Sequence, residues 1–558
     1  MKGETVEGTA TLCEAFQATV AARPGDAVAL RTLDSKVQIT WGAYAQRVRA
    51  ITGGLHAIGM RRGDTLALML ANRPEFNVVD TAAMHLGVTA FSVYNTLPVE
   101  QIAYQLENSE ASVVVTEPQL VERVLVARTP AVRAIVLVEG EHSEATTLDT
   151  IESSGPGDFD FDAAWHAVQP DDVLTLIYTS GTTGNPKGVE LTHANLLAQN
   201  RAIEAVLPTA PGDQALSYLP AAHLADRWTS HYWPSICRGA TITTVPDLAQ
   251  LSAAFVQVRP TMIITVPRVL EKLKAGLEAA GVTEPAALDP AAKKAALARI
   301  GFDRMEWPIA AGAPVAVDLL QFWADLDLPV LEAWGMTELG AFATLSPPGA
   351  IRIGTAGRPM PGFELRLLED GEILARGPSV MKGYRNDPIR TAEALDPDGW
   401  VHTGDIGTID DDGYVRIVDR KKEIIINSAG KNMSPANIEW RLKASSPLIG
   451  QAICIGDGRR YNVALLVLDP DTSGKWAAER GLDPSLASLA VNDDLLAAIA
   501  SAVEEANQQL SRVEQIKRFE VLAVDWLPAG DELTPTSKLK RKPIQEKYAD
   551  VIDRLYAH

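Results

Sequence analysis

Short apolar runs rich in β-branched residues alternate with amphipathic helical segments from the start of the chain to about Tyr384. Such runs are typical of strands that are buried on both faces, and a helix between two of them can connect them in parallel. The alternation predicts an α/β fold in which a large N-terminal domain is built from layered α/β subdomains. The clearest predicted strands are Leu66–Leu70, Val113–Thr116, Ile135–Val138, Ile242–Val245 and Met262–Val266.

The pattern changes after Gly383, where loop-forming residues precede two apolar runs joined by a turn at Asp411–Gly413. Because 558 residues exceed what one hydrophobic core normally holds, we expect more than one unit. We predict a large domain at 1–418, a hinge at the charged residues 419–422, and a small mobile α+β domain at 423–558. A solvated charged turn is the alternative for 419–422. In the small domain we expect a helix at Leu495–Leu510 and strands at Ala452–Ile455, Val463–Leu468 and Phe519–Val524.

The composition excludes several classes of protein. A formal net charge of −20 argues against electrostatic capture of nucleic acid over the whole surface. The three cysteines, Cys13, Cys237 and Cys454, lack metal-ligand spacing, and we expect buried, inert thiols. Neither a signal peptide nor a run of about 18 apolar residues is visible, so we expect a cytoplasmic protein. Peripheral membrane contact through a small apolar patch is left open, as is the choice between monomer and homodimer.

The strongest chemical signal is the segment Tyr178–Gly188, which reads YTSGTTGNPKG and follows the apolar run Val173–Ile177. Glycines, hydroxyls and one lysine after a buried strand offer backbone N–H groups, side-chain donors and a cation to a polyphosphate. The segment is not a Walker A loop, because Lys187 precedes Gly188, which is followed by Val189. A generic flexible loop is the alternative.

This segment resembles the phosphate loop of the adenylate-forming superfamily, which contains acyl-CoA synthetases, peptide-synthetase adenylation domains and beetle luciferases. Further motifs follow in that family's order across nearly the whole chain, and the resemblance is strongest to long-chain fatty acyl-CoA synthetases. It implies that ATP is bound by Thr179, Ser180, Gly181, Thr182, Thr183, Gly184 and Lys187.

Trp334-Gly335-Met336-Thr337-Glu338 resembles the family's second signature. There the aromatic residue flanks adenine, the threonine meets the α-phosphate region, and the glutamate holds Mg²⁺, a hard cation that prefers carboxylate oxygen. Taken alone, the Thr337-Glu338 pair is more typical of a helix cap. Gly312 and Ala313, within Ala311–Pro314, are similar to the family's adenine-binding turn, and a plain loop is the alternative.

Three motifs near the predicted hinge and beyond complete the resemblance. Asp405, in Thr403-Gly404-Asp405, matches the aspartate that accepts hydrogen bonds from the ribose hydroxyls, and Arg420 matches an arginine that reaches ribose or phosphate. Lys422 falls at the family's hinge position. Gly430, in Ser428–Asn432, matches the loop that lines the pantetheine tunnel of coenzyme A, and a plain turn is the alternative.

Lys538, in Leu533–Arg541, matches the catalytic lysine, whose ammonium stabilises charge at the α-phosphate and the carboxylate oxygen. A solvated basic tail is the alternative, and Ser537 stands where many members have glycine. His223, in the segment Leu219–Arg227, resembles a residue of the acyl-site wall in which an acidic-basic pair follows the histidine. A core or surface histidine is the alternative. Trp228 and Trp233 are candidates for the wall of an acyl tunnel or for plain core.

The resemblance implies an AMP-forming acyl-CoA ligase with ATP, Mg²⁺, coenzyme A and a long-chain fatty acid as small-molecule reactants. No GxSxG nucleophile motif is present, which fits a reaction that needs no enzyme nucleophile. The alternatives are a fatty acyl-AMP ligase that serves a carrier protein, a medium-chain or aryl acid ligase, and a catalytically silent nucleotide-binding protein on the same scaffold.

Overall fold

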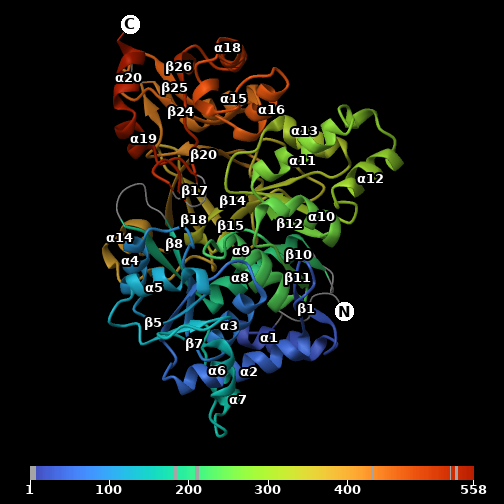
Figure 1. Ribbon diagram of the computed structural model, residues 1–558, viewed down its shortest axis with the longest axis vertical. Helices are drawn as coiled ribbons and strands as arrows, with labels where there is room; N and C mark the ends of the chain where they lie inside the picture. The colour runs from blue at the N-terminus through green and yellow to red at the C-terminus, as the bar shows by residue number, and fades with distance from the viewer. Residues whose placement is uncertain are drawn as a thin grey trace. The chain divides into compact units, whose positions relative to one another are not determined.

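A computed structural model describes residues 8–179, 185–207, 213–428, 431–527, 530–534 and 538–557 of the chain (Figure 1). Two compact units are present. The large unit comprises Met1–Arg366, Leu374–Thr403 and Ile409–Arg416. The small unit comprises Leu367–Ile373, Gly404–Thr408 and Ile417–His558.

An eight-stranded sheet in the large unit has the order β19-β9-β8-β4-β3-β5-β6-β7. Strands β3 to β8 of this sheet run parallel to one another, whereas β9 pairs antiparallel with β8 and β19 pairs antiparallel with β9. The predicted strands in this region are confirmed, because both faces of the parallel strands are buried. The strands are β3 (Thr65–Met69), β4 (Thr89–Ser92), β5 (Ala111–Thr116), β6 (Ala134–Leu137), β7 (Thr146–Thr147), β8 (Val173–Thr179), β9 (Lys187–Thr192) and β19 (Gly383–Tyr384).

Two further sheets belong to the large unit. One has the order β10-β11-β1-β2, and the other has the order β12-β13-β14-β15-β16, in which β12, β13 and β14 are parallel. Their strands are β1 (Val28–Thr32), β2 (Gln38–Thr40), β10 (Gln214–Ser217), β11 (Thr241–Thr244), β12 (Met262–Thr265), β13 (Trp307–Ala310), β14 (Leu331–Met336), β15 (Ala341–Leu345) and β16 (Arg358–Pro359). A four-stranded sheet contains β17 (Glu364–Leu367), β18 (Glu372–Arg376), β20 (Val401–Ile409) and β21 (Val415–Arg420).

Helices cover the sheets of the large unit. Helix α2 packs against α3, α6 and α7 at the end of this unit that is lowest in Figure 1. The helices are α1 (Leu12–Ala22), α2 (Trp41–Ala57), α3 (Pro74–His85), α4 (Val99–Ser109), α5 (Val121–Ala127), α6 (Leu148–Ser153), α7 (Phe161–His166), α8 (His193–Val206), α9 (Leu224–Asp226), α10 (Leu251–Val258), α11 (Pro267–Ala279), α12 (Pro290–Arg299), α13 (Val317–Asp325) and α14 (Pro388–Ala394). Residues Arg227–Cys237 form a π-helix, η2.

Short 3₁₀ turns complete the large unit: η1 (Pro118–Leu120), η3 (Leu248–Gln250), η4 (Pro285–Ala287) and η5 (Thr337–Leu339). All three cysteines are buried, as the sequence predicts, and burial raises the pKa of each thiol.

The small unit is built on a three-stranded sheet with the order β24-β25-β26. Helices α15 and α18 cover one face of the sheet, and α19 and α20 cover the other (Figure 1). Alternate residues of β25 therefore enter two separate cores, which explains why this strand is apolar throughout. The elements are β22 (Ile425–Ile426), β23 (Asn432–Met433), α15 (Pro435–Ser445), β24 (Ile449–Ile455), β25 (Asn462–Leu468), α16 (Pro470–Ala478), α17 (Leu486–Leu489), α18 (Asp493–Gln508), β26 (Ile516–Leu522), α19 (Arg541–Lys547) and α20 (Ala549–Tyr556).

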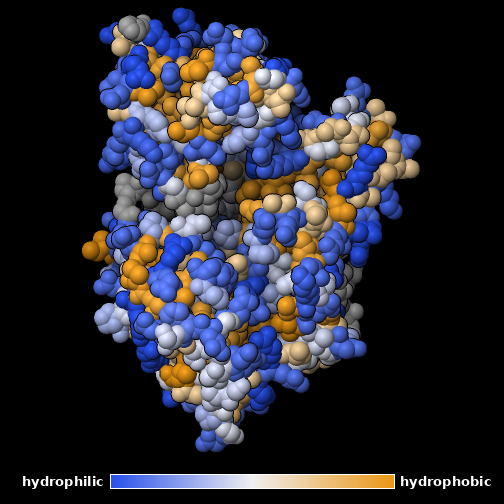
Figure 2. All heavy atoms as spheres, viewed as in Figure 1, coloured by the Kyte–Doolittle hydropathy of each residue, from blue (hydrophilic) through white to orange (hydrophobic). Residues whose placement is uncertain are grey.

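The molecular surface in the view of Figure 2 is largely polar, with apolar side chains gathered in separate patches. The most exposed large apolar residues, Val126, Ile389 and Val491, belong to unrelated segments of the chain. In the described part of the chain, no helix combines the length and the hydropathy that a membrane span requires.

Candidate active site

The glycine-hydroxyl segment connects two neighbouring strands of the eight-stranded sheet. Thr179 ends β8, Lys187 begins β9, and the two residues face each other across the antiparallel pair. The Oγ1 atom of Thr179 is buried and lacks a hydrogen-bond partner among the described residues, so this hydroxyl can bind a ligand atom. The predicted ligands Ser180, Gly181, Thr182, Thr183 and Gly184 lie outside the described residues.

Lys187 and Glu338, which are 151 positions apart in sequence, lie together around the side chain of Tyr384. Lys187 Nζ donates a hydrogen bond of 2.8 Å to Tyr384 Oη, and Tyr384 Oη donates one of 2.8 Å to Glu338 Oε1. Lys187 Nζ also lies 3.9 Å from Glu338 Oε1 and 4.2 Å from the centre of the Tyr384 ring. The structure therefore joins the predicted phosphate-binding lysine to the predicted metal ligand.

Tyr384 is a residue that the sequence analysis missed. Strand β19 places it beside β9, where Tyr384 pairs with Val189 and Gly383 pairs with Glu190. Burial, followed by the nearby Glu338 carboxylate, raises the pKa of the Tyr384 hydroxyl, so this group keeps its proton and donates to Glu338. A two-residue strand that pairs with a segment 195 positions earlier leaves no local signal in the sequence.

Glu338 lies in η5, directly after β14, and is 5% exposed, whereas Thr337 is 9% exposed. The N-cap of η5 is Met336, and its side chain makes no capping bond, so the helix-cap alternative for the Thr337-Glu338 pair is wrong. The main chain of Glu338 is also fixed, because its carbonyl accepts a hydrogen bond of 2.9 Å from Met381 N. These contacts hold the carboxylate at the end of β14.

The predicted adenine-binding residues lie at the same edge of one sheet. Gly312 and Ala313 follow β13, and Trp334 lies near the end of the neighbouring parallel strand β14. Carboxyl ends of adjacent parallel strands are a common place for ligands to bind. Gly312 has a φ of +84°, a conformation that glycine adopts most readily. Trp334 is 8% exposed and pairs with Thr344 of β15.

Gly335 allows β14 and β15 to approach closely next to the Thr337-Glu338 turn. A Cβ atom at this position would lie 1.8 Å from the carbonyl oxygen of Ala341. A side chain here would separate the two strands, which explains why a glycine stands between Trp334 and Met336.

A second group of predicted residues lies in the small unit. Arg420 Nε and Asp405 Oδ1 form an ion pair of 2.7 Å, and Asp405 is 4% exposed. Lys421 binds Asp370 at 2.6 Å and Glu372 at 2.7 Å, and its backbone N–H donates to the Gly404 carbonyl. The charged segment 419–422 therefore binds carboxylates of its own unit. Arg420, Lys421 and Lys422 are exposed and a turn covers 421–423, as the alternative of a solvated charged turn predicts.

The two predicted catalytic loops of the small unit differ in how much of each is described. Lys538 N donates a hydrogen bond of 3.0 Å to Thr534 Oγ1, and Thr534 N donates one of 2.8 Å to the Lys538 carbonyl. Lys538 also takes part in a further interaction. Gly430 lies outside the described residues, but strands β22 and β23 on either side of it pair as a hairpin.

His223 begins the short helix α9, where its Nδ1 accepts a hydrogen bond of 3.0 Å from Ala225 N. The acidic and basic residues that follow it, Asp226 and Arg227, do not form an ion pair with each other among the described contacts. Asp226 accepts hydrogen bonds from Ser217 Oγ at 2.9 Å and Tyr218 N at 3.1 Å. Burial raises the pKa of Asp226 to about 7, although these donors favour the ionised form.

Arg227 instead forms an ion pair with Asp80 of α3, and both side chains are fully buried. Asp80 also accepts a contact of 3.1 Å from His231 Nε2. Trp228 and Trp233 stack with ring centres 5.6 Å apart and are fully buried, as the plain-core alternative predicts. Asp80 was not predicted from sequence patterns, because it lies in α3, whose sequence is largely apolar and far from η2 along the chain.

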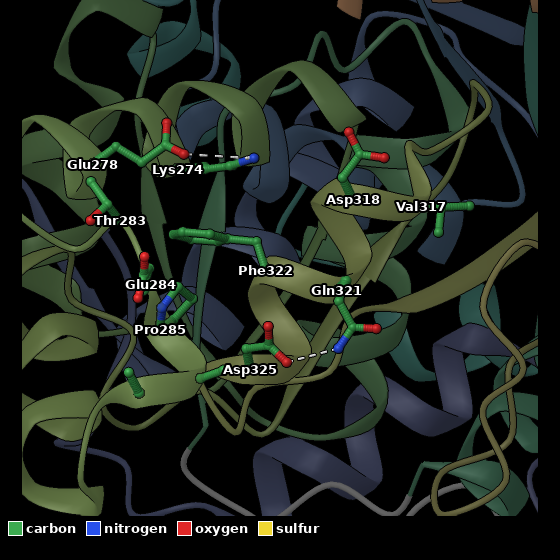
Figure 3. A pocket seen from close by; sticks show the side chains of 12 residues that line it. Lys274, Glu278, Thr283, Glu284, Pro285, Val317, Asp318, Gln321, Phe322 and Asp325 are labelled. Carbon is green, nitrogen blue, oxygen red and sulfur yellow. Dashed lines mark hydrogen bonds and ion pairs between the residues drawn. The ribbon is translucent and has the colours of Figure 1, made fainter. Parts of the chain in front are cut away.

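A separate cavity of about 610 Å³ lies between α11, η4 and α13 (Figure 3). Lys274 bridges toward Glu278 at 3.7 Å, and Phe322 lies between these helices. Three further carboxylates surround it and would repel a triphosphate, and none of the predicted site residues lines it. They are Glu284, Asp318 and Asp325.

The residues present fit a magnesium ion that is held mainly by its substrate. In the described ranges, no cluster of three or more histidine, cysteine or acidic side chains could hold a metal ion by itself. Mg²⁺ commonly binds one or two protein carboxylates together with substrate phosphates and water. The single carboxylate of Glu338, beside the cation Lys187, suits such an ion.

Two family models match this chain. The family model described as AMP-binding enzyme matches residues 16–385, and the one described as AMP-binding enzyme C-terminal domain matches residues 422–558. Fatty-acid–CoA ligase fadD11 of Mycobacterium tuberculosis is 49% identical over 448 residues, covering 74% of this chain and 78% of the relative.

A second relative is similar over nearly its whole length. Long-chain-fatty-acid–CoA ligase FadD15 of Mycobacterium bovis is 34% identical over 556 residues, covering 93% of this chain and 92% of the relative. The crystal structure of the adenylation domain of a carboxylate reductase from Mycobacterium chelonae has a TM-score of 0.80 at 21% identity, covering 100% of this chain and 94% of that one. At that identity the likeness shows the fold alone.

Proposed function

The chain belongs to the AMP-binding enzyme family, and on that basis we propose that it activates a long-chain fatty acid with ATP and transfers the acyl group to coenzyme A. The relatives named as fatty-acid–CoA ligases support this class of acid. The cytoplasm is the proposed compartment, because ATP and coenzyme A are the proposed co-substrates.

The observation that carries the proposal is the cluster of Lys187, Tyr384 and Glu338. It presents a cation and a carboxylate within 3.9 Å of each other at the ends of two different sheets. A triphosphate with its magnesium ion needs both charges, one for phosphate oxygen and one for the metal. Bound at Glu338, Mg²⁺ would neutralise charge on the phosphates.

In the proposed first half-reaction, a carboxylate oxygen of the fatty acid attacks the α-phosphorus and pyrophosphate leaves. Lys187 and Thr179 would hold the phosphates, while Gly312, Ala313 and Trp334 would border the adenine. Thr337 would meet the α-phosphate, and His223 would lie at the acid. Lys538 would stabilise the charge that builds in the transition state, so alignment and electrostatics would supply most of the catalysis.

In the proposed second half-reaction, the thiol sulfur of coenzyme A attacks the acyl carbonyl, the thiol proton passes to solvent, and AMP leaves. Gly430 would border the pantetheine arm, and Asp405 with Arg420 would hold the ribose. We propose domains at 1–418 and 423–558 with a hinge at 419–422, which would let the small domain serve both half-reactions.

The first test measures ATP/pyrophosphate exchange with purified protein across saturated fatty acids of graded length and with benzoate as an aryl acid. We expect exchange that is highest with long-chain acids, and acyl-CoA as the product by mass spectrometry when coenzyme A is added. Acyl-AMP without acyl-CoA would indicate transfer to a carrier protein instead. Exchange with benzoate alone would overturn the proposed acid class, and absence of exchange with every acid would overturn the ligase.

The second test separates the half-reactions with Lys538→Ala. We expect adenylate formation to fall by about 10²-fold or more, because a group that stabilises transition-state charge is removed. Thiolysis of supplied acyl-AMP should be largely retained. Lys542→Ala is the matched control, because Lys542 has a side chain that is 74% exposed and pairs only with Glu546 at 3.8 Å among the described contacts. Equal loss of both half-reactions in Lys538→Ala would contradict the assigned role.

A further inference from the structure

The side chain of Arg541 joins three segments of the small unit that are far apart in sequence. Its guanidinium binds Glu439 of α15 through two hydrogen bonds, of 2.5 Å and 2.8 Å. A third hydrogen bond, of 3.1 Å, reaches Glu423, which lies just before β22. A planar guanidinium held by two carboxylates in this way has a defined position and orientation.

This cluster is buried and depends on the arginine. The side chains of Arg541 and Glu439 are 17% and 6% exposed. Burial raises the pKa of the Glu439 carboxyl, whereas the charge of Arg541 and a hydrogen bond from Cys454 N oppose that rise. The Glu439 carboxylate therefore relies on Arg541 for its charge balance, and a lysine would not reproduce the two parallel hydrogen bonds.

Arg541 is the first residue of α19 and follows Lys538 by three positions. The chain between them belongs to a closed loop. Leu533 and Leu539 form an antiparallel bridge, and Lys540 N donates to the Glu532 carbonyl at 2.7 Å. These bonds tie the residues between Lys538 and Arg541 to the segment 532–534, so we expect a shift of Arg541 to move the backbone of Lys538.

The hairpin β22–β23, which carries the proposed coenzyme A loop, has bonds of its own. Ser428 N donates to the Arg459 carbonyl at 2.9 Å, and Ile426 N donates to Asp457 Oδ1 at 3.0 Å. Asn427 N donates to the Lys431 carbonyl at 3.1 Å. These bonds do not involve Arg541, so the hairpin should keep its position when the arginine is replaced.

We propose that Arg541 is a positioning residue for adenylate formation, because its bonds to Glu439 and Glu423 fix the loop that presents Lys538. This assignment rests on the proposed ligase function. It predicts that the two half-reactions respond differently: adenylate formation depends on the anchor, and thiolysis of acyl-AMP does not.

The test measures both half-reactions in Arg541→Met and Arg541→Lys, with a long-chain fatty acid, ATP and coenzyme A as the reactants. A displacement of about 1 Å in a catalytic group can lower a rate by about 10²-fold. We therefore expect kcat for ATP/pyrophosphate exchange to fall by about 10²-fold in Arg541→Met and by less in Arg541→Lys. The KM for ATP and thiolysis of supplied acyl-AMP should each change by less than about threefold.

Two further variants separate positioning from loss of folding. In Arg541→Met combined with Glu439→Leu, the buried carboxylate is removed together with its partner, so the small unit should remain folded by circular dichroism. Exchange should still be low in this double variant. Lys542→Met is the matched control at the neighbouring exposed cation, and its exchange rate should be unchanged.

A double-mutant cycle tests whether Arg541 acts through Lys538. In the Lys538→Ala background, Arg541→Lys should cause no further loss of exchange, because the group that it positions is absent. Additive losses, equal losses of both half-reactions, or full exchange in the folded double variant would each overturn the assignment. Absence of exchange in the unmodified protein would instead overturn the ligase function itself.

Discussion

Tyr384→Phe removes one oxygen atom from the centre of the cluster that joins Lys187 to Glu338. The lost hydroxyl accepts a hydrogen bond of 2.8 Å from Lys187 Nζ and donates one of 2.8 Å to Glu338 Oε1. A hydrogen bond to a charged group contributes about 1.5–3 kcal/mol. Lys187 and Glu338 are already 3.9 Å apart and can approach each other, so we count the loss of one such bond.

At about 1.4 kcal/mol for each factor of ten, this loss corresponds to a decrease of about 10- to 150-fold in the rate of adenylate formation. The concentration of Mg²⁺ that gives half the maximal rate should also rise, because Glu338 is the proposed metal ligand and loses the group that orients it. The assay is ATP/pyrophosphate exchange at a saturating concentration of fatty acid over a series of Mg²⁺ concentrations.

Tyr414→Phe provides the matched control for this substitution. Tyr414 is 5% exposed, and its hydroxyl donates to the carbonyl of Ala350, away from the cluster. This variant should change the stability of the large unit without changing the Mg²⁺ dependence. If Tyr384→Phe kept both the rate and the Mg²⁺ dependence of the unmodified protein, the cluster would have no part in metal or phosphate binding.

Three other perturbations test the structure. Gly335→Ala should lower the free energy of unfolding by about 3 kcal/mol and abolish adenylate formation, because its Cβ would lie 1.8 Å from a carbonyl oxygen of β15; Gly276→Ala, with open space around it, should stay within about 1 kcal/mol in urea denaturation. Arg227→Met should cost about 3–5 kcal/mol by leaving the buried carboxylate of Asp80 without its main counter-charge. Replacing both Arg227 and Asp80 with apolar residues should restore much of the lost free energy of unfolding. A double variant less stable than Arg227→Met would contradict this expectation. Burial lowers the pKa of His193 from 6.5 to about 3. Only the unfolded state therefore takes up this proton as the pH falls from about 6.5 to 3, and stability falls by about 1.4 kcal/mol per pH unit; His193→Asn should flatten the pH profile of thermal unfolding in that window.

Much of the secondary structure of this chain could be predicted from local sequence patterns. The strand predicted at Leu66–Leu70 is Thr65–Met69, and the helix predicted at Leu495–Leu510 is Asp493–Gln508. The spacing of apolar residues in each element matches the face or faces that the fold buries, so the element can be recognised in the sequence. Boundaries were less exact where long-range pairing ends an element, as at the strand predicted to begin at Phe519, which begins at Ile516.

The motifs of the candidate site were also visible in sequence, because glycine, hydroxyl and charged residues in a short segment indicate their chemistry directly. The residues that connect these motifs were not visible. The acidic-basic pair Asp226-Arg227 reads as one unit, yet Asp226 binds Ser217 and Arg227 binds Asp80. Adjacent residues on a helix point in different directions, so their partners depend on which elements pack on each side.

Local sequence patterns were therefore enough to predict the α/β alternation, the change to a smaller unit, and Lys187, Glu338 and Lys538 as candidates. Only the tertiary structure brought Tyr384 between the first two and placed Arg541 against Glu439 beside the third. Periodicity and turn chemistry act between residues that are close in sequence. The hydrogen bonds of these clusters join residues 46 to 197 positions apart, and such contacts exist only once the sheets have paired and the cores have packed.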